Sequence, residues 1–151
     1  MECKIKQCIC ESKVWKARLV TEYLIGTGGW AYLSVPGKSS LKAYSEIFNS
    51  VEVNYTFYEY PDAKTVERWR RIVPQDFTFT VRCHQDLTHR IGLRPVEEAY
   101  RVFNRMVGYC RVLEAPFLHL ETPKNYVLDD TNLRQARDFL SSISLRGVRL
   151  A

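Results

Sequence analysis

Short apolar runs and amphipathic segments alternate along the 151-residue chain. Residues 77–83 (FTFTVRC) alternate apolar and polar side chains, and a period of two predicts a half-buried strand. Residues 95–113 carry apolar side chains at helical spacing after a proline, which predicts a long amphipathic helix with Pro95 at its first position. By the same signals, strands are expected at 22–27, 50–54, 77–83, 116–122 and 147–151, and helices at 39–48, 62–73, 95–113 and 129–143.

This strict alternation indicates the α/β class, with a parallel sheet and right-handed crossovers. Two architectures compete, an open doubly wound sheet and a TIM (β/α)8 barrel. The central strands of an open sheet are covered on both faces and should be nearly all apolar. Here Val51 and Val53 share one face of their strand, whereas Glu52 and Asn54 share the other, and the third and fourth strands repeat this division. A polar face turned toward an interior favours the barrel.

A barrel of this type needs about 250 residues. This chain supplies four βα units and the start of a fifth strand, so we expect a partial barrel. It would be a fragment of a longer protein, a half-barrel or a truncated gene product. Unclosed edge strands would favour a homodimer or pairing with a complementary half-barrel.

Charge and apolar content restrict the partners. The 22 Lys and Arg residues against 17 Asp and Glu give a net charge of +5, which favours an anionic small molecule or a nucleic acid as partner. The basic run RWRR (68–71) is expected to be a solvated helix face. No segment approaches the roughly 20 apolar residues that span a bilayer, and the N-terminus lacks the apolar core of a signal peptide. We therefore expect no membrane partner and a cytoplasmic protein.

The five cysteines are an odd number, which argues for reduced thiols. Cys3, Cys8 and Cys10 form a C-x4-C-x-C pattern that matches no common zinc motif. They are expected to be free thiols on a loosely ordered N-terminal extension, residues 1–22, ahead of a single domain at 23–151.

Three motifs carry a resemblance to a known family: IGTGGWAY (25–32), FNSVEVNYTFYEYP (48–61) and RCHQDLTH (82–89). In these motifs, and in LHLETPKNY (118–126), the chain resembles the YecE-like family, also called domain of unknown function 72. The resemblance covers about residues 23–151 and implies a TIM-barrel fold. It also implies that members of the family continue beyond the point where this chain ends. The activity of the family is not settled, so the resemblance implies the location of a site and no reaction.

The sequence also departs from the family pattern. Gly28 stands where the family usually has Ser, and Tyr55 where it has a small hydroxyl residue. Glu121 replaces the usual Gln, and Lys124–Tyr126 replace a Pro-Ser-Phe type run. The charge of Glu121 changes a presumed site position, so the substrate of the relatives is not carried over to this chain.

Barrel sites lie at the carboxyl ends of the strands. There the pattern predicts Glu52 as a general acid or base and His84 as a proton shuttle. The predicted substrate-binding residues are Arg82 as an anion clamp, Trp30 as a stacking wall, and Asn54, Tyr58 and Glu121.

Structural roles compete with these assignments. Glu52 and Arg82, on neighbouring strands, would form an ion pair that satisfies both. His119 would be a hydrogen-bonded core residue, and His89 would cap a turn in which Asp86 accepts a backbone hydrogen bond. In the segment 81–89, Cys83 faces the helices and is expected to be a small buried apolar residue.

A divalent metal would need three converging ligands, and Glu52, His84, His119 and Glu121 are the candidates. Their expected heights along the strands do not match, so no metal site is predicted. The glycines of IGTGGW do not form G-x-G-x-x-G, so no nucleotide cofactor is expected either.

The favoured function is acid/base or hydrolytic chemistry on a phosphate- or carboxylate-bearing substrate. The first alternative is a non-catalytic nucleic-acid-binding barrel that stacks bases on Trp30, Tyr58 and Tyr60. The second is a fragment that is inactive without its complementary half.

Overall fold

A parallel four-stranded sheet forms the centre of the structure, a computed structural model that describes residues 23–151. The strands follow chain order, β1-β2-β3-β4, and every neighbouring pair is parallel. They are β1 (Ser50–Val53), β2 (Thr78–Arg82), β3 (Phe117–His119) and β4 (Arg149–Leu150). The predicted extension at 1–22, with Cys3, Cys8 and Cys10, lies outside the described residues.

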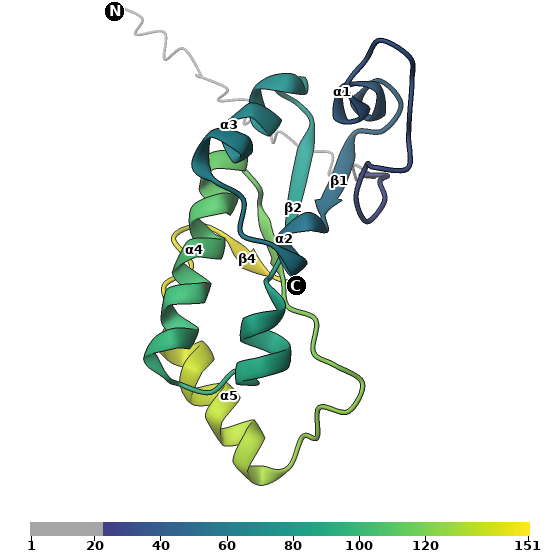
Figure 1. The fold of residues 1–151 in the computed structure, drawn as a ribbon. Helices are drawn as coiled ribbons and strands as arrows, with labels where there is room; N and C mark the ends of the chain where they lie inside the picture. Colours follow the sequence, from purple (N-terminus) through teal and green to yellow (C-terminus); the bar gives the residue numbers. More distant parts are fainter. Residues whose placement is uncertain (1–22) are drawn as a thin grey trace, which may run out of the picture.

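Helices connect the strands (Figure 1). They are α1 (Ser40–Ser45), α2 (Tyr55–Tyr58), α3 (Ala63–Ile72), the π-helix η1 (Asp86–Ile91), α4 (Glu97–Leu113) and α5 (Asp130–Ser142). Every strand and helix predicted from residue 39 onward is present, each shorter than its sequence pattern, whereas the helices α2 and η1 were not predicted.

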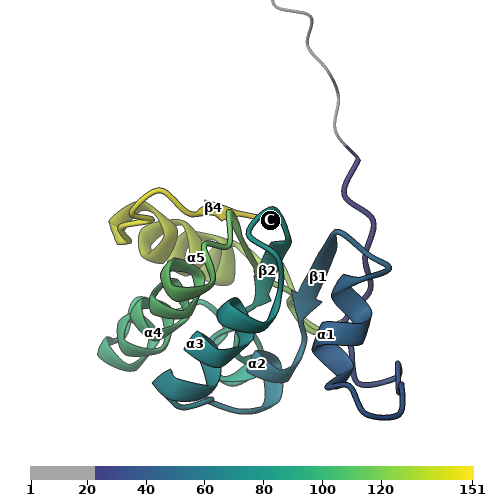
Figure 2. The ribbon, with the colours of Figure 1, turned by 90° about the horizontal axis from the view of Figure 1, so that it is seen from above.

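The three long helices, α3, α4 and α5, lie on one side of the sheet (Figure 2). Helix α4 packs against β2, β3 and α3. The opposite side of the sheet carries no helix of the described chain. The protein therefore has two layers over residues 23–151, a sheet and one layer of helices.

Burial follows the strand alternation. Val53, Phe79 and Leu118 are fully buried against the helices, whereas Glu52, Thr80 and His119 alternate with them and are half-buried. The predicted division into an apolar and a polar face is thus present in β1, β2 and β3. No helix in the described chain is long and apolar enough to cross a bilayer.

The predicted first strand, residues 22–27, is wrong in its extent. The described part of this segment lies beside β1 without forming a strand, and the one isolated bridge to β1, between Gly28 and Glu52, lies just beyond it. Hydrogen bonds from Glu52 N–H to Thr27 (3.1 Å) and from Gly29 N–H to Glu52 (2.9 Å) hold it there. Pairing ends because Gly29 turns the chain away at φ +92, and because Ile25 N–H donates to the Asn49 side chain instead of a backbone carbonyl (2.8 Å).

Side-chain caps set several helix starts. The Asp62 carboxylate accepts from Thr65 N–H at 2.8 Å and begins α3 as predicted, and Asp129 does the same for α5. The prediction for Pro95 is wrong, because α4 begins at Glu97 with Val96 as its N-cap. Val96 has extended backbone angles (φ −112, ψ 153), so the helix starts two residues beyond the proline.

Candidate functional site

Five polar side chains meet on the uncovered face, at the carboxyl ends of the strands. We call them the strand-end cluster: Glu52, Asn54, Arg82, His119 and Glu121. Glu52, Arg82 and His119 lie in three strands whose register sets Arg82 opposite His119 and Glu52 opposite Thr80. Side chains two residues apart share a face of a strand, so the alternation of β1, β2 and β3 directs these three to the same side. Asn54 and Glu121 follow the ends of β1 and β3 and reach Arg82 from there.

Arg82 is the most constrained member of the cluster. Its Nη1 donates to Asn54 Oδ1 at 2.6 Å, and its Nη2 donates to the Glu121 carboxylate. The guanidinium carbon lies 4.1 Å from the centre of the Phe57 ring, a cation–π contact. Only 16% of the side chain is exposed, and its Nε is buried without a hydrogen-bond partner. The guanidinium is therefore held in one orientation by three contacts.

Glu52 and His119 form a second pair in front of β2. His119 Nδ1 lies 2.7 Å from Glu52 Oε2, although the two strands are separated by β2. About a third of the His119 side chain (35%) and 26% of Glu52 stay exposed. The pair is accessible from the uncovered face, and in the tautomer with the proton on Nδ1 it presents His119 Nε2 as an acceptor.

The predicted ion pair between Glu52 and Arg82 is wrong. Arg82 pairs with Glu121, and Glu52 pairs with His119. Glu52 lies opposite Thr80, two residues before Arg82 in β2. The Glu52 side chain therefore extends across β2 and contacts the His119 imidazole on β3. The cluster contains two carboxylates, one guanidinium and one imidazole.

An aromatic pocket adjoins the cluster and shares Asn54 with it. The pocket has a volume of about 280 Å³ and brings together the predicted Trp30, Asn54 and Tyr58. Its remaining lining residues are Gly28, Gly29, Ala31, Tyr32 and Tyr55. Two positions that depart from the family pattern, Gly28 and Tyr55, are among them.

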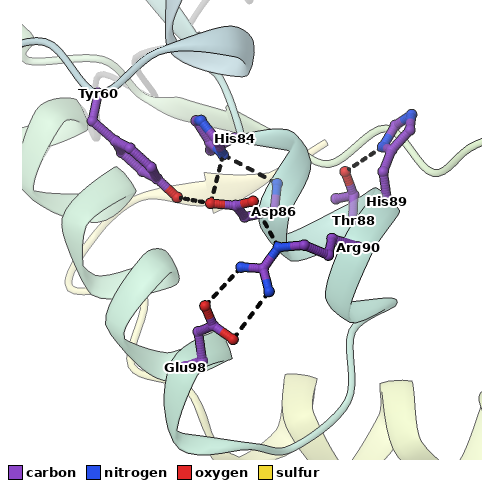
Figure 3. A network of polar contacts seen from close by, with 7 residues as sticks. All are labelled: Tyr60, His84, Asp86, Thr88, His89, Arg90 and Glu98. Carbon is purple, nitrogen blue, oxygen red and sulfur yellow. Dashed lines mark hydrogen bonds and ion pairs between the residues drawn. The ribbon is translucent and has the colours of Figure 1, made fainter.

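His84 does not join the cluster, although its sequence position suggests that it would. Its ring stacks on Tyr60 at 3.8 Å between centroids, and only 5% of the residue is exposed (Figure 3). His84 Nδ1 accepts from the Asp86 N–H at 3.1 Å, and the ring also hydrogen-bonds the Tyr58 backbone. Both sides of the imidazole are thus engaged within the protein.

The contacts continue from His84 into η1 and α4 (Figure 3). The Tyr60 hydroxyl donates to Asp86 Oδ2 at 2.7 Å, and Arg90 donates to Asp86 at 2.9 Å and to Glu98 at 2.7 Å. We call Tyr60, His84, Asp86, Arg90 and Glu98 the His84 network. The predicted turn at 86–89 is wrong, because this segment is the first part of the π-helix η1. The Asp86–Arg90 pair, four residues apart, spans that helix.

Burial and charge shift the titration of the network. Burial lowers the pKa of His84, and the Asp86 carboxylate opposes that shift. The hydrogen bond from Arg90 holds the pKa of Asp86 below its usual range. Burial, with the hydrogen bond to Asp86, raises the pKa of Tyr60. A neutral, buried imidazole between two satisfied partners is typical of a structural histidine.

The four candidate metal ligands do not converge. His84 lies in its own network, Glu121 is on Arg82, and only Glu52 and His119 touch. Within residues 23–151, no three His, Cys, Asp or Glu side chains are placed to hold a metal ion together.

Sequence reasoning undervalued three residues. His119 was expected in the core, yet it alternates with buried Leu118 as Arg82 alternates with buried Val81, which was the available signal. Phe57 under the guanidinium and Tyr32 in the pocket had no signal, since both come from segments without strand periodicity.

His89 hydrogen-bonds Thr88 at 2.9 Å, while Gly92, in the left-handed region at φ 72, ends η1.

The expectation for Cys83 is confirmed. The residue is 1% exposed and is a free thiol packed in the core. Burial raises its pKa to about 12, so it stays protonated at neutral pH.

Comparison with known proteins identifies the family. The model of the family described as "Protein of unknown function DUF72" matches residues 24–151. The chain therefore belongs to the DUF72 family, as its motifs suggested.

Two curated relatives carry the designation UPF0759. The chain is 32% identical over 102 residues to YunF of Bacillus subtilis (strain 168), which covers 63% of this chain and 35% of YunF. It is 34% identical over 67 residues to YecE of Escherichia coli (strain K12), which covers 44% of this chain and 25% of YecE. The matches span about a third or less of these relatives.

Two crystal structures of a DUF72 family protein from Enterococcus faecalis V583 resemble the fold. Their TM-scores are 0.57 and 0.60, at 15% and 16% sequence identity. Each match covers 80% of this chain and 48% of that protein. At this identity the likeness shows the fold alone.

Proposed function

We propose that residues 23–151 are the first part of a TIM (β/α)8-type barrel. Three features support this: the strands follow chain order, all pairs are parallel, and the long helices cover one face only. An open doubly wound sheet would reverse its strand order and carry helices on both faces. In a barrel the polar face becomes the interior, and the strand-end cluster occupies the end where barrel enzymes place their sites.

At that end, we propose acid/base or hydrolytic chemistry on an anionic substrate. The observation that carries the proposal is the Glu52–His119 pair, with its 2.7 Å contact. A carboxylate on Nδ1 fixes the orientation and the tautomer of the imidazole, so Nε2 can accept a proton from water or from the substrate. Glu52 then positions His119, which is the catalytic base, whereas sequence reasoning gave the direct role to Glu52.

Arg82 supplies the second part of the site. It is oriented by Asn54 and Phe57, and its contact with the Glu121 carboxylate supports the proposal that it binds an anionic substrate oxygen. Glu121 is 48% exposed, so its carboxylate can leave the guanidinium when a substrate arrives. Phosphate and carboxylate groups both suit this geometry.

The test is hydrolysis of p-nitrophenyl phosphate and bis(p-nitrophenyl) phosphate. His119→Gln should lower kcat/KM by about 100-fold, the smaller end of general-base contributions. Glu52→Gln should lower kcat and change the pH profile, and Glu52→Asp should restore part of the activity, which a merely structural role would not produce. His89→Gln and Glu97→Gln, at exposed positions, are the matched controls.

Two results would contradict the hydrolytic proposal: no turnover of either ester, or turnover equal in His119→Gln and His89→Gln. Circular dichroism of each variant separates loss of chemistry from loss of fold.

Nucleic-acid binding is the second candidate, favoured by the exposed Tyr32 and Tyr58 beside Trp30 and by the net charge of +5. Tyr60 is not available for stacking, because His84 covers one face and Arg105 lies 4.6 Å from its centroid. Binding to single-stranded oligonucleotides should then weaken steeply as salt rises. An affinity independent of salt would contradict this candidate.

A further inference from the structure

The aromatic pocket is formed by side chains that a folded domain normally buries. Tyr32 is 95% exposed, Tyr58 57% and Tyr55 50%, and all three surround one hollow with Trp30. Isolated exposed aromatic residues are ordinary, but several around one concavity indicate a surface that gains by being covered.

The pocket walls are held in place from behind. The rings of Trp30 and Tyr55 both make edge-to-face contacts with Trp69 of α3, at centroid distances of 5.3 and 5.9 Å. Tyr58 packs edge-to-face on the buried Phe57 at 4.9 Å. The walls made by Trp30, Tyr55 and Tyr58 are therefore preorganised, and a ligand would not have to order them.

Gly28 and Gly29 leave the floor of the aromatic pocket open, because glycine has no side chain. A Cβ on Gly28 would lie 3.9 Å from Asn54 Nδ2, and one on Gly29 would lie 3.7 Å from Asn54 Cβ. Gly29 also has φ +92, which disfavours any side chain there. Two flat residues thus leave room over Asn54 for a planar group.

Asn54 connects the pocket to the anion clamp. Its Oδ1 accepts from Arg82, while its Nδ2 lies on the Gly28 side, facing the pocket. A ligand with a ring in the pocket would lie beside Asn54, whose other side-chain atom contacts the guanidinium. The volume of about 280 Å³ suits one ring system and leaves any charged group outside, at the strand ends.

We propose that the substrate of this site is a ring-bearing phosphate monoester, with its aromatic or heterocyclic ring in the aromatic pocket and its phosphate on Arg82. The proposal rests on the proposed function, since it uses the same clamp, and it adds the substrate class. Aryl phosphates and nucleoside monophosphates share this chemistry.

Isothermal titration of the whole chain with three ligands tests it: phenyl phosphate, adenosine monophosphate and glycerol phosphate. The first two carry a ring and the third carries only the anion. Stacking of one base on an aromatic side chain is worth about 1–3 kcal/mol, so we expect at least about fivefold tighter binding for a ring-bearing ligand than for glycerol phosphate. Preference for phenyl phosphate or for the nucleotide identifies which source is used.

Tyr58→Ala should remove most of the ring preference and leave glycerol phosphate binding unchanged. Tyr23→Ala, at an exposed tyrosine (78%) outside the pocket, is the matched control and should change neither. Equal affinity for all three ligands, or equal effects of the two tyrosine variants, would overturn the proposal.

Failure of the inference can be separated from failure of the proposed function. Glu52→Gln should keep the ring preference, because Glu52 does not line the pocket, while it loses turnover. If the ring preference is absent but turnover still depends on Glu52 and His119, the substrate class is overturned and the function stands. If no phosphate binds, the inference is overturned, and the turnover assay decides the function independently.

Discussion

At the scale of single residues, the contact between Glu121 and Arg82 bears on the proposed anion site. Its carboxylate lies on the guanidinium that would hold a substrate anion, and nearly half of its side chain is exposed. It therefore competes with any bound anion, and it adds negative charge to a cluster that already contains Glu52.

We predict that Glu121→Gln strengthens the binding of inorganic phosphate, by up to about fivefold, since partly exposed ion pairs are worth about 1 kcal/mol or less. Titration calorimetry at low ionic strength measures the effect. Glu97→Gln, which removes an exposed carboxylate far along the chain on α4, controls for net charge. Equal gains in the two variants would mean that only net charge matters.

Two glycines should respond oppositely to the same substitution. A Cβ on Gly26 would lie 2.1 Å from the Ser50 backbone oxygen, so Gly26→Ala must push the segment before Gly28 away from β1. Gly108 is in α4, and a Cβ there would meet nothing within 4 Å.

We predict that Gly26→Ala lowers the free energy of unfolding by about 1–3 kcal/mol. Gly108→Ala should raise it by about 0.5–1 kcal/mol through helix propensity. Urea unfolding compares both variants with the wild type. A neutral Gly26→Ala would show that the contact with β1 does not contribute to stability.

At the scale of elements, the His84 network fastens the end of β2 to η1 and α4. Because the pKa of His84 is lowered by folding, the unfolded chain takes up its proton more readily. The stabilisation is complete above the ordinary histidine pKa of 6.5 and is lost as pH falls below that value. Asp86, whose pKa is also lowered, loses its contribution in the same direction below about 3.8.

We predict that stability declines from pH 7.5 to pH 5, and that His84→Gln flattens this decline while lowering stability at pH 7.5. The measurement is the free energy of unfolding in urea at several pH values. His89→Gln, at an exposed neighbour on η1, should keep the wild-type slope. An unchanged slope in His84→Gln would assign the pH dependence to other groups.

At the scale of the whole molecule, residues 23–151 leave one face of the sheet without a helix, and β1 and β4 are the edge strands. The half-buried Thr80 and Phe117 lie on that face, and β4 is a two-residue strand at the sheet edge with one strand neighbour. The unpaired backbone groups of an edge strand favour association with another sheet. We propose that two copies of the chain associate through the uncovered face and its edges.

We predict a concentration-dependent dimer in sedimentation velocity experiments. Thr80→Arg places a large charge at the middle of the uncovered face and should shift the population to monomer. Thr131→Arg adds the same charge at an exposed position of α5 and should not. A monomer at all concentrations, or a dimer insensitive to Thr80→Arg, would contradict the proposal.

Local signals in the sequence were sufficient for most of the elements. The alternation of residues 77–83 and the Asp62 cap are properties of adjacent residues, and both are present in the structure. The first strand and the start of α4 were misjudged, because Gly29 and Val96 adopt backbone angles that the apolar pattern does not report.

The sequence by itself determined the order of the strands and the longer helices from residue 39 onward, and it assigned Glu52 and Arg82 to a polar face, since a period of two assigns each strand residue to a face. Only the tertiary structure decided the partners. The strand register brings His119, and not Arg82, into contact with Glu52. Arg82 pairs with Glu121 instead. Packing between residues far apart in the chain stacks His84 on Tyr60, away from the strand-end cluster. It also brings Trp30, Tyr32 and Tyr58 together around one pocket.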